Sequence, residues 1–281
     1  MAHPDQLEPL RAIADGAGRV VFLTGAGISA ESGIPTFRGP EGFWTVGSQV
    51  YRPQELATWD MFSRQPDLVW PWYLWRRDIC RRANPNSAHN CLVALESVLG
   101  DRFTLVTQNV DGLHLRAGSS PERTLEIHGN IDYFRCAQGC SPRRGVPDLA
   151  GVGEHSGFLT EWGEALECSR CRCWMRPHVL WFDECYDEDN YRFESAVAAM
   201  SDAEALIVVG TTGATSLPAH MLQIAVMRGI FVLDINPEDN PFARAAVRGP
   251  GAWLQTPATE GMRRVQTVIE DALKESPQTS R

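Results

Sequence analysis

The chain has 281 residues and carries 26 Lys and Arg against 35 Asp and Glu, which gives a formal net charge of −9 at pH 7. A negative molecule repels polyanions, so this charge argues against a general nucleic-acid binder, and we expect no nucleic-acid partner. With 43 % hydrophobic and 22 % charged residues, the sequence is typical of a globular protein and excludes the disordered and fibrous classes.

Four apolar runs have the composition of buried strands, at residues 19–23, 103–107, 205–210 and 230–235. Segments of helical character lie between these runs, for example at residues 88–99 and 218–227. Strands that alternate with helices predict a parallel, doubly wound, Rossmann-like α/β sheet.

Two stretches interrupt this alternation. Residues 40–82 are rich in aromatic side chains and look helical without strand signals, whereas residues 134–176 look like loops and contain close cysteine pairs. We expect both stretches to form a smaller lobe against the sheet. The predicted domains are a Rossmann-like domain in three parts (1–39, 84–133 and 179–281), a helical insertion (40–83) and a cysteine-containing module (134–178).

The longest apolar runs, such as residues 206–209, are much shorter than the roughly 20 residues that a membrane-spanning helix needs. The first residues lack a basic stretch followed by an apolar one, which is the pattern of a secretory signal. We therefore expect a cytoplasmic protein with no membrane partner. In a reducing compartment, close cysteine pairs are more typical of metal binding than of disulfides.

Gly25, Gly27 and Ala30 follow the first predicted strand with the spacing of a dinucleotide-binding turn. Glycines at these positions let backbone amides approach a pyrophosphate at a helix N-terminus. The same spacing also fits a tight turn without a ligand. A hydride-transfer enzyme would need an acidic residue about 20 positions later, at the end of a second strand, and no strand is predicted there. A dehydrogenase therefore fits poorly.

Cys136 and Cys140 form one close pair, and Cys168 and Cys171 form a second. Four thiolates in two pairs suit a tetrahedral structural Zn²⁺ with no open coordination position. Cys173 could replace Cys171 as the fourth ligand, and free thiols or a redox-active pair are the other interpretations. We expect the module at 134–178 to bind one structural zinc ion.

Five motifs follow one another along the chain: GAGISAESGIPTFRG at 25–39, TQNVDGLH at 107–114, HG at 128–129, the paired cysteines, and RPHVLWF at 176–182. Together they resemble the sirtuins, a family of NAD-dependent protein-lysine deacylases. The resemblance implies that NAD is a co-substrate. The acyl oxygen of a modified lysine attacks C1′ of the nicotinamide ribose, nicotinamide leaves, and the acyl group ends on ADP-ribose. The family's spacing also favours Cys171 over Cys173 as the zinc ligand.

The resemblance further implies the site residues. His128 matches the general base, and a side chain that titrates near neutrality suits that role. Asn109 and Asp111 match the catalytic residues that accompany the base. The positions that match NAD contacts are Gly25, Ala26, Gly27, Thr36, Phe37, Arg38, Gln108, Asn109, Asp111, Gly210, Thr211, Thr212, Asn236, Glu238 and Ala252. The loop at Phe37 and Arg38 is the expected mobile cover. The segment after Gly210 is one residue longer than the usual spacing, so spacing alone does not fix the match at Thr212.

Tyr73 and Arg76 lie three residues apart, which places them on one face of a helix. In sirtuins that remove malonyl, succinyl or glutaryl groups, such a pair lines the acyl pocket. A distal carboxylate in an apolar tunnel needs a charge-assisted partner, which an Arg beside a Tyr hydroxyl provides. Composition alone fits an amphipathic helix whose arginines face water.

The resemblance places Leu180, through its backbone carbonyl, and Phe182 at the substrate tunnel. Asp183 stands where the family usually has Gly, in the segment that pairs with the substrate peptide, so the peptide register or preference can differ.

The expected function is removal of succinyl and malonyl groups, with glutaryl and acetyl as further substrates, from acylated-lysine proteins or peptides. The alternatives are a protein mono-ADP-ribosyltransferase and a non-catalytic NAD-sensing module. The presence of His128 together with Asn109 and Asp111 favours deacylation. The sequence does not indicate an oligomeric state.

Overall fold

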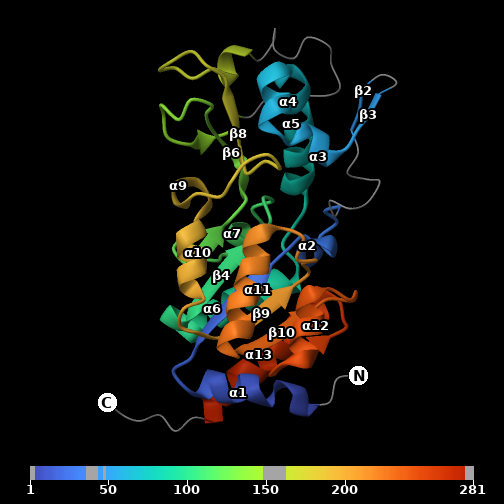
Figure 1. The fold of residues 1–281 in the computed structure, drawn as a ribbon, viewed down its shortest axis with the longest axis vertical. Coiled ribbons are helices and arrows are strands. Elements are labelled where there is room, and N and C mark those ends of the chain that lie inside the picture. The colour runs from blue at the N-terminus through green and yellow to red at the C-terminus, as the bar shows by residue number, and fades with distance from the viewer. Residues whose placement is uncertain (1–3, 36–43, 47–48, 148–162, 276–281) are drawn as a thin grey trace.

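The computed structural model of the protein describes residues 4–35, 44–46, 49–147 and 163–275. Its largest element is a parallel sheet of six strands (Figure 1). In sheet order the strands are β11 (Gly251–Leu254), β10 (Phe231–Ile235), β9 (Ala203–Val209), β1 (Arg19–Thr24), β4 (Phe103–Thr107) and β5 (Thr124–Glu126). The strand order reverses between β1 and β9, which is the topological switch point of a Rossmann-like sheet. The predicted doubly wound α/β fold is confirmed.

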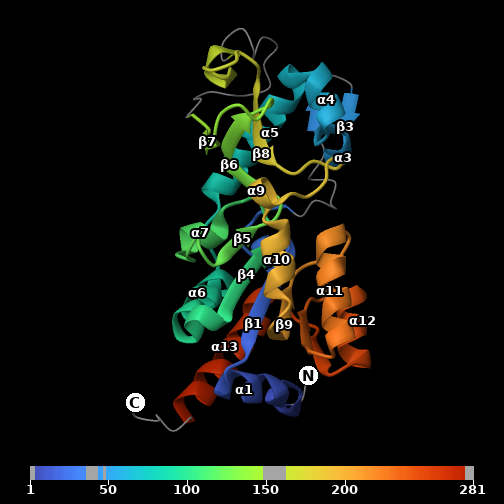
Figure 2. The same cartoon turned by 60° about the vertical axis from the view of Figure 1, so that its left-hand side comes forward.

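Helices cover both faces of this sheet, as Figure 2 shows with α6 on one side and α11 and α12 on the other. Side chains of β1 alternate between the two faces, since Val20 and Phe22 pack in one core cluster and Val21 and Leu23 in the other. This alternation explains why the whole strand is apolar. The first face carries α1 (Glu8–Asp15), α6 (Ser87–Leu99) and α13 (Ala258–Glu275). The second carries α10 (Phe193–Ala199), α11 (Ser216–Arg228) and α12 (Pro241–Arg248).

A smaller lobe lies beyond the carboxyl ends of the strands, at the top of Figure 1. It contains a three-stranded sheet of β7 (Arg144–Gly145), β6 (Gly129–Cys136) and β8 (Met175–Val179). Against it pack α3 (Pro53–Leu56), α4 (Trp59–Arg64) and α5 (Pro66–Arg82). A single apolar cluster, which includes Trp70, Phe134 and Trp181, joins the helices to the small sheet.

Two local expectations for the small lobe were wrong. The stretch at 40–82 contains a short antiparallel pair, β2 (Trp44–Val46) and β3 (Gln49–Tyr51), and the stretch at 134–176 is not all loop because β7 and parts of β6 and β8 lie in it. β6 and β8 pair across a long sequence distance and β8 contains a proline, whereas β2 and β3 have only three residues each, so no local alternation marked these strands. The domain boundaries stay a prediction, and β6 runs across the one at 133/134.

The remaining elements are short. They are η1 (Pro4–Leu7), α2 (Gly27–Ala30), η3 (Gly100–Arg102), α7 (Leu113–Ala117), η4 (Gly163–Leu166) and α9 (Glu188–Tyr191). Across the described ranges, no helix combines the length and the apolar character needed to cross a membrane.

Candidate active site

The loops that follow β1, β4, β9 and β10 meet at one edge of the sheet. Backbone hydrogen bonds join the strand ends: the Gly25 amide donates to Val209 O (3.0 Å), the Gln108 amide to Thr24 O (3.0 Å), and the Gly210 amide to Ile235 O (3.0 Å). Open parallel sheets bind ligands at this edge, next to the switch point. The sheet therefore brings four of the predicted NAD-binding segments together.

The glycines of these loops let two backbones touch. A Cβ added to Gly27 would lie 2.6 Å from Gly210 Cα, and one added to Gly25 would lie 2.6 Å from Thr211 Cβ. Gly210 also has a φ of +62°, which side chains with a Cβ rarely adopt. The turn at Gly25–Gly27 is therefore packed against the loop after β9, and both present backbone to the same space.

A buried polar cluster lies under this turn. The side-chain nitrogen Nδ2 of Asn109 donates to Gly25 O (3.1 Å) and to Ser29 Oγ (3.2 Å). Ser29 Oγ in turn donates to Asp111 Oδ2 (2.7 Å), and the Leu113 amide donates to Asp111 Oδ1 (2.8 Å). Burial raises the pKa of Asp111, and these hydrogen bonds partly oppose the rise. Asn109 and Asp111 thus share Ser29, which the sequence analysis did not name although it lies inside the first motif.

The loop after β9 is fastened by side chains from its neighbours. Gln108 Nε2 donates to Thr211 Oγ1 (2.8 Å), and Thr215 Oγ1 donates to Gln108 Oε1 (3.1 Å). Asn236 Nδ2 donates to Thr211 O (3.0 Å), and Asn236 Oδ1 accepts the Glu238 amide (3.2 Å). The predicted residues Gln108, Thr211 and Asn236 therefore form one connected group.

Other predicted NAD contacts lie outside this group. Thr212 is half-buried beside Thr211, and the Glu238 side chain is exposed. Ala252 lies inside β11, and its side chain packs in the core of the sheet instead of facing the loops. Ala26 precedes α2 at the turn. Thr36, Phe37 and Arg38 fall outside the described residues.

His128 lies between the two lobes, just before β6. Its Nδ1 lies 2.9 Å from Gln108 O, so Nδ1 carries the proton because a carbonyl can only accept. Its Nε2 therefore accepts the hydroxyl hydrogen of Tyr186 at 2.8 Å. Burial lowers the pKa of His128 to about 4, opposed in part by the Gln108 carbonyl. The imidazole is thus neutral at pH 7 and has a lone pair at Nε2.

The next residue fixes the position of His128. Gly129 has a φ of +82°, and a Cβ there would lie 2.0 Å from His178 O. The backbone carbonyl of His128 accepts the Leu180 amide at 2.9 Å. The pair His128–Gly129 therefore needs glycine so that β6 can lie close to β8.

Tyr73 and Arg76 lie on the buried face of α5, with 4 % and 7 % exposure. The Tyr73 hydroxyl accepts the Trp181 indole N–H at 2.7 Å, and the Arg76 guanidinium lies 5.4 Å from the centre of the Trp72 ring. Arg76 is also close enough to Asp111 for its charge to lower the pKa of that carboxyl. The pair therefore faces the interior beside the polar cluster, and the alternative in which these arginines all face water is wrong for Arg76.

The neighbouring arginines of α5 have other partners. Arg77 Nε and Arg81 Nε each donate to Asp132 Oδ1 at 2.9 Å, which ties α5 to β6. Arg82 pairs with Asp78 at the exposed end of the helix. Arg76, in contrast, is linked electrostatically to Asp111.

The segment that contains Leu180, Phe182 and Asp183 follows β8 and lies against α3 and α4. Phe182 is 58 % exposed, and its amide donates to Ala57 O at 3.0 Å. The Asp183 carboxylate accepts the amides of Trp59 (2.8 Å) and of Asp60 (3.1 Å) at the start of α4. A carboxylate at that place satisfies amides that the helix leaves open. Asp183 therefore binds this segment to the helical insertion.

The four predicted cysteines form one cluster. Cys136 Sγ lies 3.4 Å from Cys140 Sγ and 3.5 Å from Cys171 Sγ, and Cys140 Sγ lies 3.5 Å from Cys168 Sγ. Four sulfurs around Zn²⁺ at 2.3 Å lie about 3.8 Å apart, so the cluster fits one zinc ion. Cys173 does not belong to it and uses its carbonyl to accept the Cys168 amide at 2.8 Å. Cys171 is thus the fourth member.

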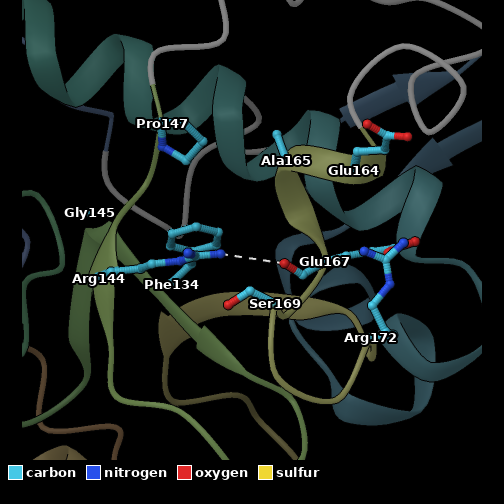
Figure 3. A pocket seen from close by; sticks show the side chains of 9 residues that line it. All are labelled: Phe134, Arg144, Gly145, Pro147, Glu164, Ala165, Glu167, Ser169 and Arg172. Carbon is cyan, nitrogen blue, oxygen red and sulfur yellow. Dashed lines mark hydrogen bonds and ion pairs between the residues drawn. The ribbon is translucent and has the colours of Figure 1, made fainter.

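A cavity of about 440 Å³ lies in the same module, between β7 and the segment around η4 (Figure 3). Its lining includes Phe134, Arg144 and an ion pair between Arg172 and Glu167 (2.7 Å). Of the predicted catalytic and NAD-binding residues that the structure describes, none lines this cavity. The cavity is therefore separate from the polar cluster at the strand ends.

The chain matches the profile of the Sir2 family over residues 25–216. A protein of Leptospira interrogans serovar Lai named NAD-dependent protein deacylase is 42 % identical over 225 residues, which cover 80 % of this chain and 84 % of that protein. A Thermus thermophilus protein of the same name is 39 % identical over 261 residues, covering 92 % and 93 %.

Solved structures agree with these relatives. A Sir2 homologue in complex with NAD is similar with a TM-score of 0.78 and 33 % identity, over 97 % of this chain and 96 % of that chain. A structure described as Sir2–p53 peptide–NAD⁺ is similar with a TM-score of 0.73 and 28 % identity, over 93 % and 97 %.

Proposed function

Since the chain belongs to the Sir2 family and is an NAD-dependent protein deacylase, we propose that it removes acidic acyl groups, succinyl and malonyl above all, from lysine side chains. Glutaryl and acetyl are further substrates in this proposal. The observation that carries it is the burial of Tyr73 and Arg76 on α5, with Arg76 in electrostatic range of Asp111. A buried guanidinium beside the reaction site favours a substrate that brings its own negative charge.

The proposed acyl pocket uses two donors. The Tyr73 hydroxyl accepts the Trp181 indole N–H, so its own proton can point to a ligand. Burial raises the pKa of Tyr73, so the hydroxyl stays protonated and remains a donor. Arg76 supplies the charge and the planar fork that match a carboxylate. An acetyl group lacks the carboxylate and would gain nothing from either donor.

The proposed chemistry assigns His128 as the base. In the reaction the acyl oxygen forms a bond to C1′ of the nicotinamide ribose as the bond from C1′ to nicotinamide breaks. A ribose hydroxyl then loses its proton to a base, and the neutral His128 with its lone pair at Nε2 suits that step. Asn109, Asp111 and Ser29 would hold the nicotinamide end of NAD, because their hydrogen bonds form a fixed polar wall beside the glycine turn.

We further propose that the loops after β9 and β10 hold the rest of NAD. Thr211 and the backbone at Gly210 would face its phosphates, and Asn236 with Glu238 its adenosine ribose. Gln108 connects these loops to the base, through its side chain to Thr211 and its carbonyl to His128. Leu180 and Phe182 would contact the substrate lysine from the segment after β8. The zinc ion is structural in this scheme, since four thiolates leave it no open position.

The experiment is an incubation of the purified protein with NAD and matched acetyl-, malonyl-, succinyl- and glutaryl-lysine peptides, followed by mass spectrometry. We expect loss of the succinyl and malonyl groups, with one nicotinamide and one O-acyl-ADP-ribose formed per peptide. A faster loss of acetyl than of succinyl would contradict the acidic-acyl proposal. Intact peptides together with protein-bound ADP-ribose would instead indicate a mono-ADP-ribosyltransferase.

A further inference from the structure

Tyr186 lies in the connection between β8 and α9, a few residues after the proposed substrate segment. Its half-buried ring stands 5.8 Å from the ring of His128 and 6.1 Å from that of Phe193, measured between ring centres. No motif of the sequence marks this tyrosine as functional. Its position nevertheless puts a hydroxyl directly against the proposed base.

The direction of the hydrogen bonds follows from simple constraints. The proton of His128 sits on Nδ1 because Gln108 O accepts it, so Nε2 has one lone pair and no proton. The Tyr186 hydroxyl lies 2.8 Å from Nε2 and must be the donor of that bond. Burial raises the pKa of Tyr186 to about 12, so the phenol stays protonated at neutral pH.

A second partner for the phenol lies nearby. The side chain of Thr215 also interacts with the Tyr186 hydroxyl. The Thr215 hydroxyl donates its hydrogen bond to Gln108 Oε1 at 3.1 Å, so the Thr215 oxygen can accept a hydrogen bond from Tyr186. Gln108, His128 and Tyr186 are therefore linked by hydrogen bonds, and Thr215 offers the phenol proton an alternative acceptor in the loop after β9.

Nε2 of His128 can accept only one strong hydrogen bond. A ribose hydroxyl that gives its proton to His128 must come within about 2.6–3.2 Å of the same atom. The Tyr186 hydroxyl and the ribose hydroxyl therefore exclude each other. We propose that Tyr186 is a positioning residue that donates its hydrogen bond to Nε2 of His128 in the nucleotide-free enzyme. When NAD binds, the ribose hydroxyl takes this place at Nε2, and the Tyr186 hydroxyl donates to Thr215 instead.

This inference rests on the proposed role of His128 as the base, and it adds a competitor for that base within the chain. The competition has a measurable consequence for affinity. NAD binding must break the bond between Tyr186 and His128 before the ribose can use Nε2. A variant without the phenol hydroxyl has no such bond to break. In this variant Nε2 of His128 also lacks the phenol as a hydrogen-bond partner until the ribose hydroxyl binds. Both effects favour tighter binding of the nucleotide.

The test is calorimetric titration of ADP-ribose into the wild type and into Tyr186→Phe. Phenylalanine keeps the ring contacts with His128 and Phe193 and removes only the hydroxyl. We expect the Kd for ADP-ribose to fall about threefold to tenfold in Tyr186→Phe. ADP lacks the second ribose, so its Kd should not change. In assays with an acyl peptide, the KM for NAD should fall while the KM for the peptide stays constant.

Tyr191→Phe is the matched control, because the Tyr191 hydroxyl accepts Arg135 (3.0 Å) and does not contact His128. It should leave the Kd of both nucleotides unchanged. An equal or higher Kd for ADP-ribose in Tyr186→Phe would overturn the proposal, as would an equal change for ADP. Circular dichroism checks that both variants are folded. Binding needs no turnover, so this result is independent of whether the wild type removes succinyl or acetyl groups.

Discussion

In the parallel sheet, the residues Val20 to Leu23 of β1 are fully buried and apolar, whereas in the small lobe the buried set includes Arg176 at 2 % exposure and two cysteines of the zinc cluster. The sheet is held by apolar contacts on both faces, which come from many residues with small individual contributions. The small lobe adds a few strong and specific contacts to its own apolar cluster. Arg176 lies 3.6 Å from the centre of the Trp181 ring and pairs with Glu184, and Trp70 donates to Met175 O at 3.0 Å.

This difference assigns separate tasks to the two regions. The sheet fixes the loops around Gly25 and Gly210, which we propose to hold the nucleotide. The small lobe carries the proposed acyl pocket on α5 and the segment at Phe182. We therefore expect single polar changes in the small lobe to alter peptide turnover while the sheet stays folded.

Loss of the zinc ion should have the largest effect. Zinc contributes about 10–16 kcal/mol to the folding of small zinc modules, so Cys171→Ser should empty the site and unfold β6 and β8. Zinc content by mass spectrometry and hydrogen exchange of the backbone amides measure both effects. We expect fast exchange in β6 and β8 and slow exchange in β1 and β9.

Cys173→Ser is the control for this change, because Cys173 lies outside the cluster of four sulfurs. It should keep one zinc ion per chain and slow exchange throughout. Zinc loss in Cys173→Ser with retention in Cys171→Ser would show that the ligand assignment is reversed. Equal exchange in both regions of Cys171→Ser would remove the distinction between the sheet and the lobe.

A smaller effect is expected for Arg176→Met. The substitution leaves the half-buried Glu184 and the carbonyl of Val179 without their guanidinium partner, which costs about 3–5 kcal/mol. The midpoint of urea unfolding, followed by tryptophan fluorescence, measures this loss. Arg82→Met removes an exposed ion pair on α5 and should change stability by less than about 1 kcal/mol. Similar losses in the two variants would contradict the importance of the buried pair.

The smallest effect concerns a carboxyl in the sheet. Burial raises the pKa of Asp234 from 3.8 to about 7, although Asn240 donates to its Oδ2 at 2.8 Å. The pKa of Asp234 is higher in the folded chain than in the unfolded chain. The contribution of this carboxyl to the free energy of unfolding is therefore fully present below about pH 4 and is lost as the pH rises to about 7. Asp234→Asn should therefore raise the melting temperature by about 3 °C or more at pH 8 and leave it nearly unchanged at pH 4. An equal change at both pH values would contradict the raised pKa.

The sequence allowed the sheet to be predicted, because β1, β4, β9 and β10 are apolar runs of strand length. β5 and β11 have three and four residues, which is too short for a periodic signal. The small sheet was missed for another reason. Gly129 pairs with Val179 and Cys136 with Met175, so its stability comes from residues that are distant in sequence.

The grouping of the proposed site residues was predictable where a motif carried it. Gln108, Asn109, Asp111 and His128 come together as the motifs indicate, and the cysteine geometry decides between Cys171 and Cys173. Tyr186 was missed because its proposed role depends on a contact with a residue 58 positions away, which no local pattern encodes. Ala252 was assigned to the NAD site, yet its side chain packs in the core, and its role there stays a prediction.

The most direct test of the acidic-acyl pocket compares kcat/KM for succinyl- and acetyl-lysine peptides of one sequence in the wild type, Arg76→Met and Arg82→Met. The two variants remove the same charge from the same helix, one at its buried face and the other at its exposed end. We predict that the ratio of succinyl to acetyl kcat/KM falls about tenfold or more in Arg76→Met, because a hydrogen-bonded charge is lost from the pocket. Arg82→Met should keep the wild-type ratio. An equal loss on both peptides in Arg76→Met would contradict the account.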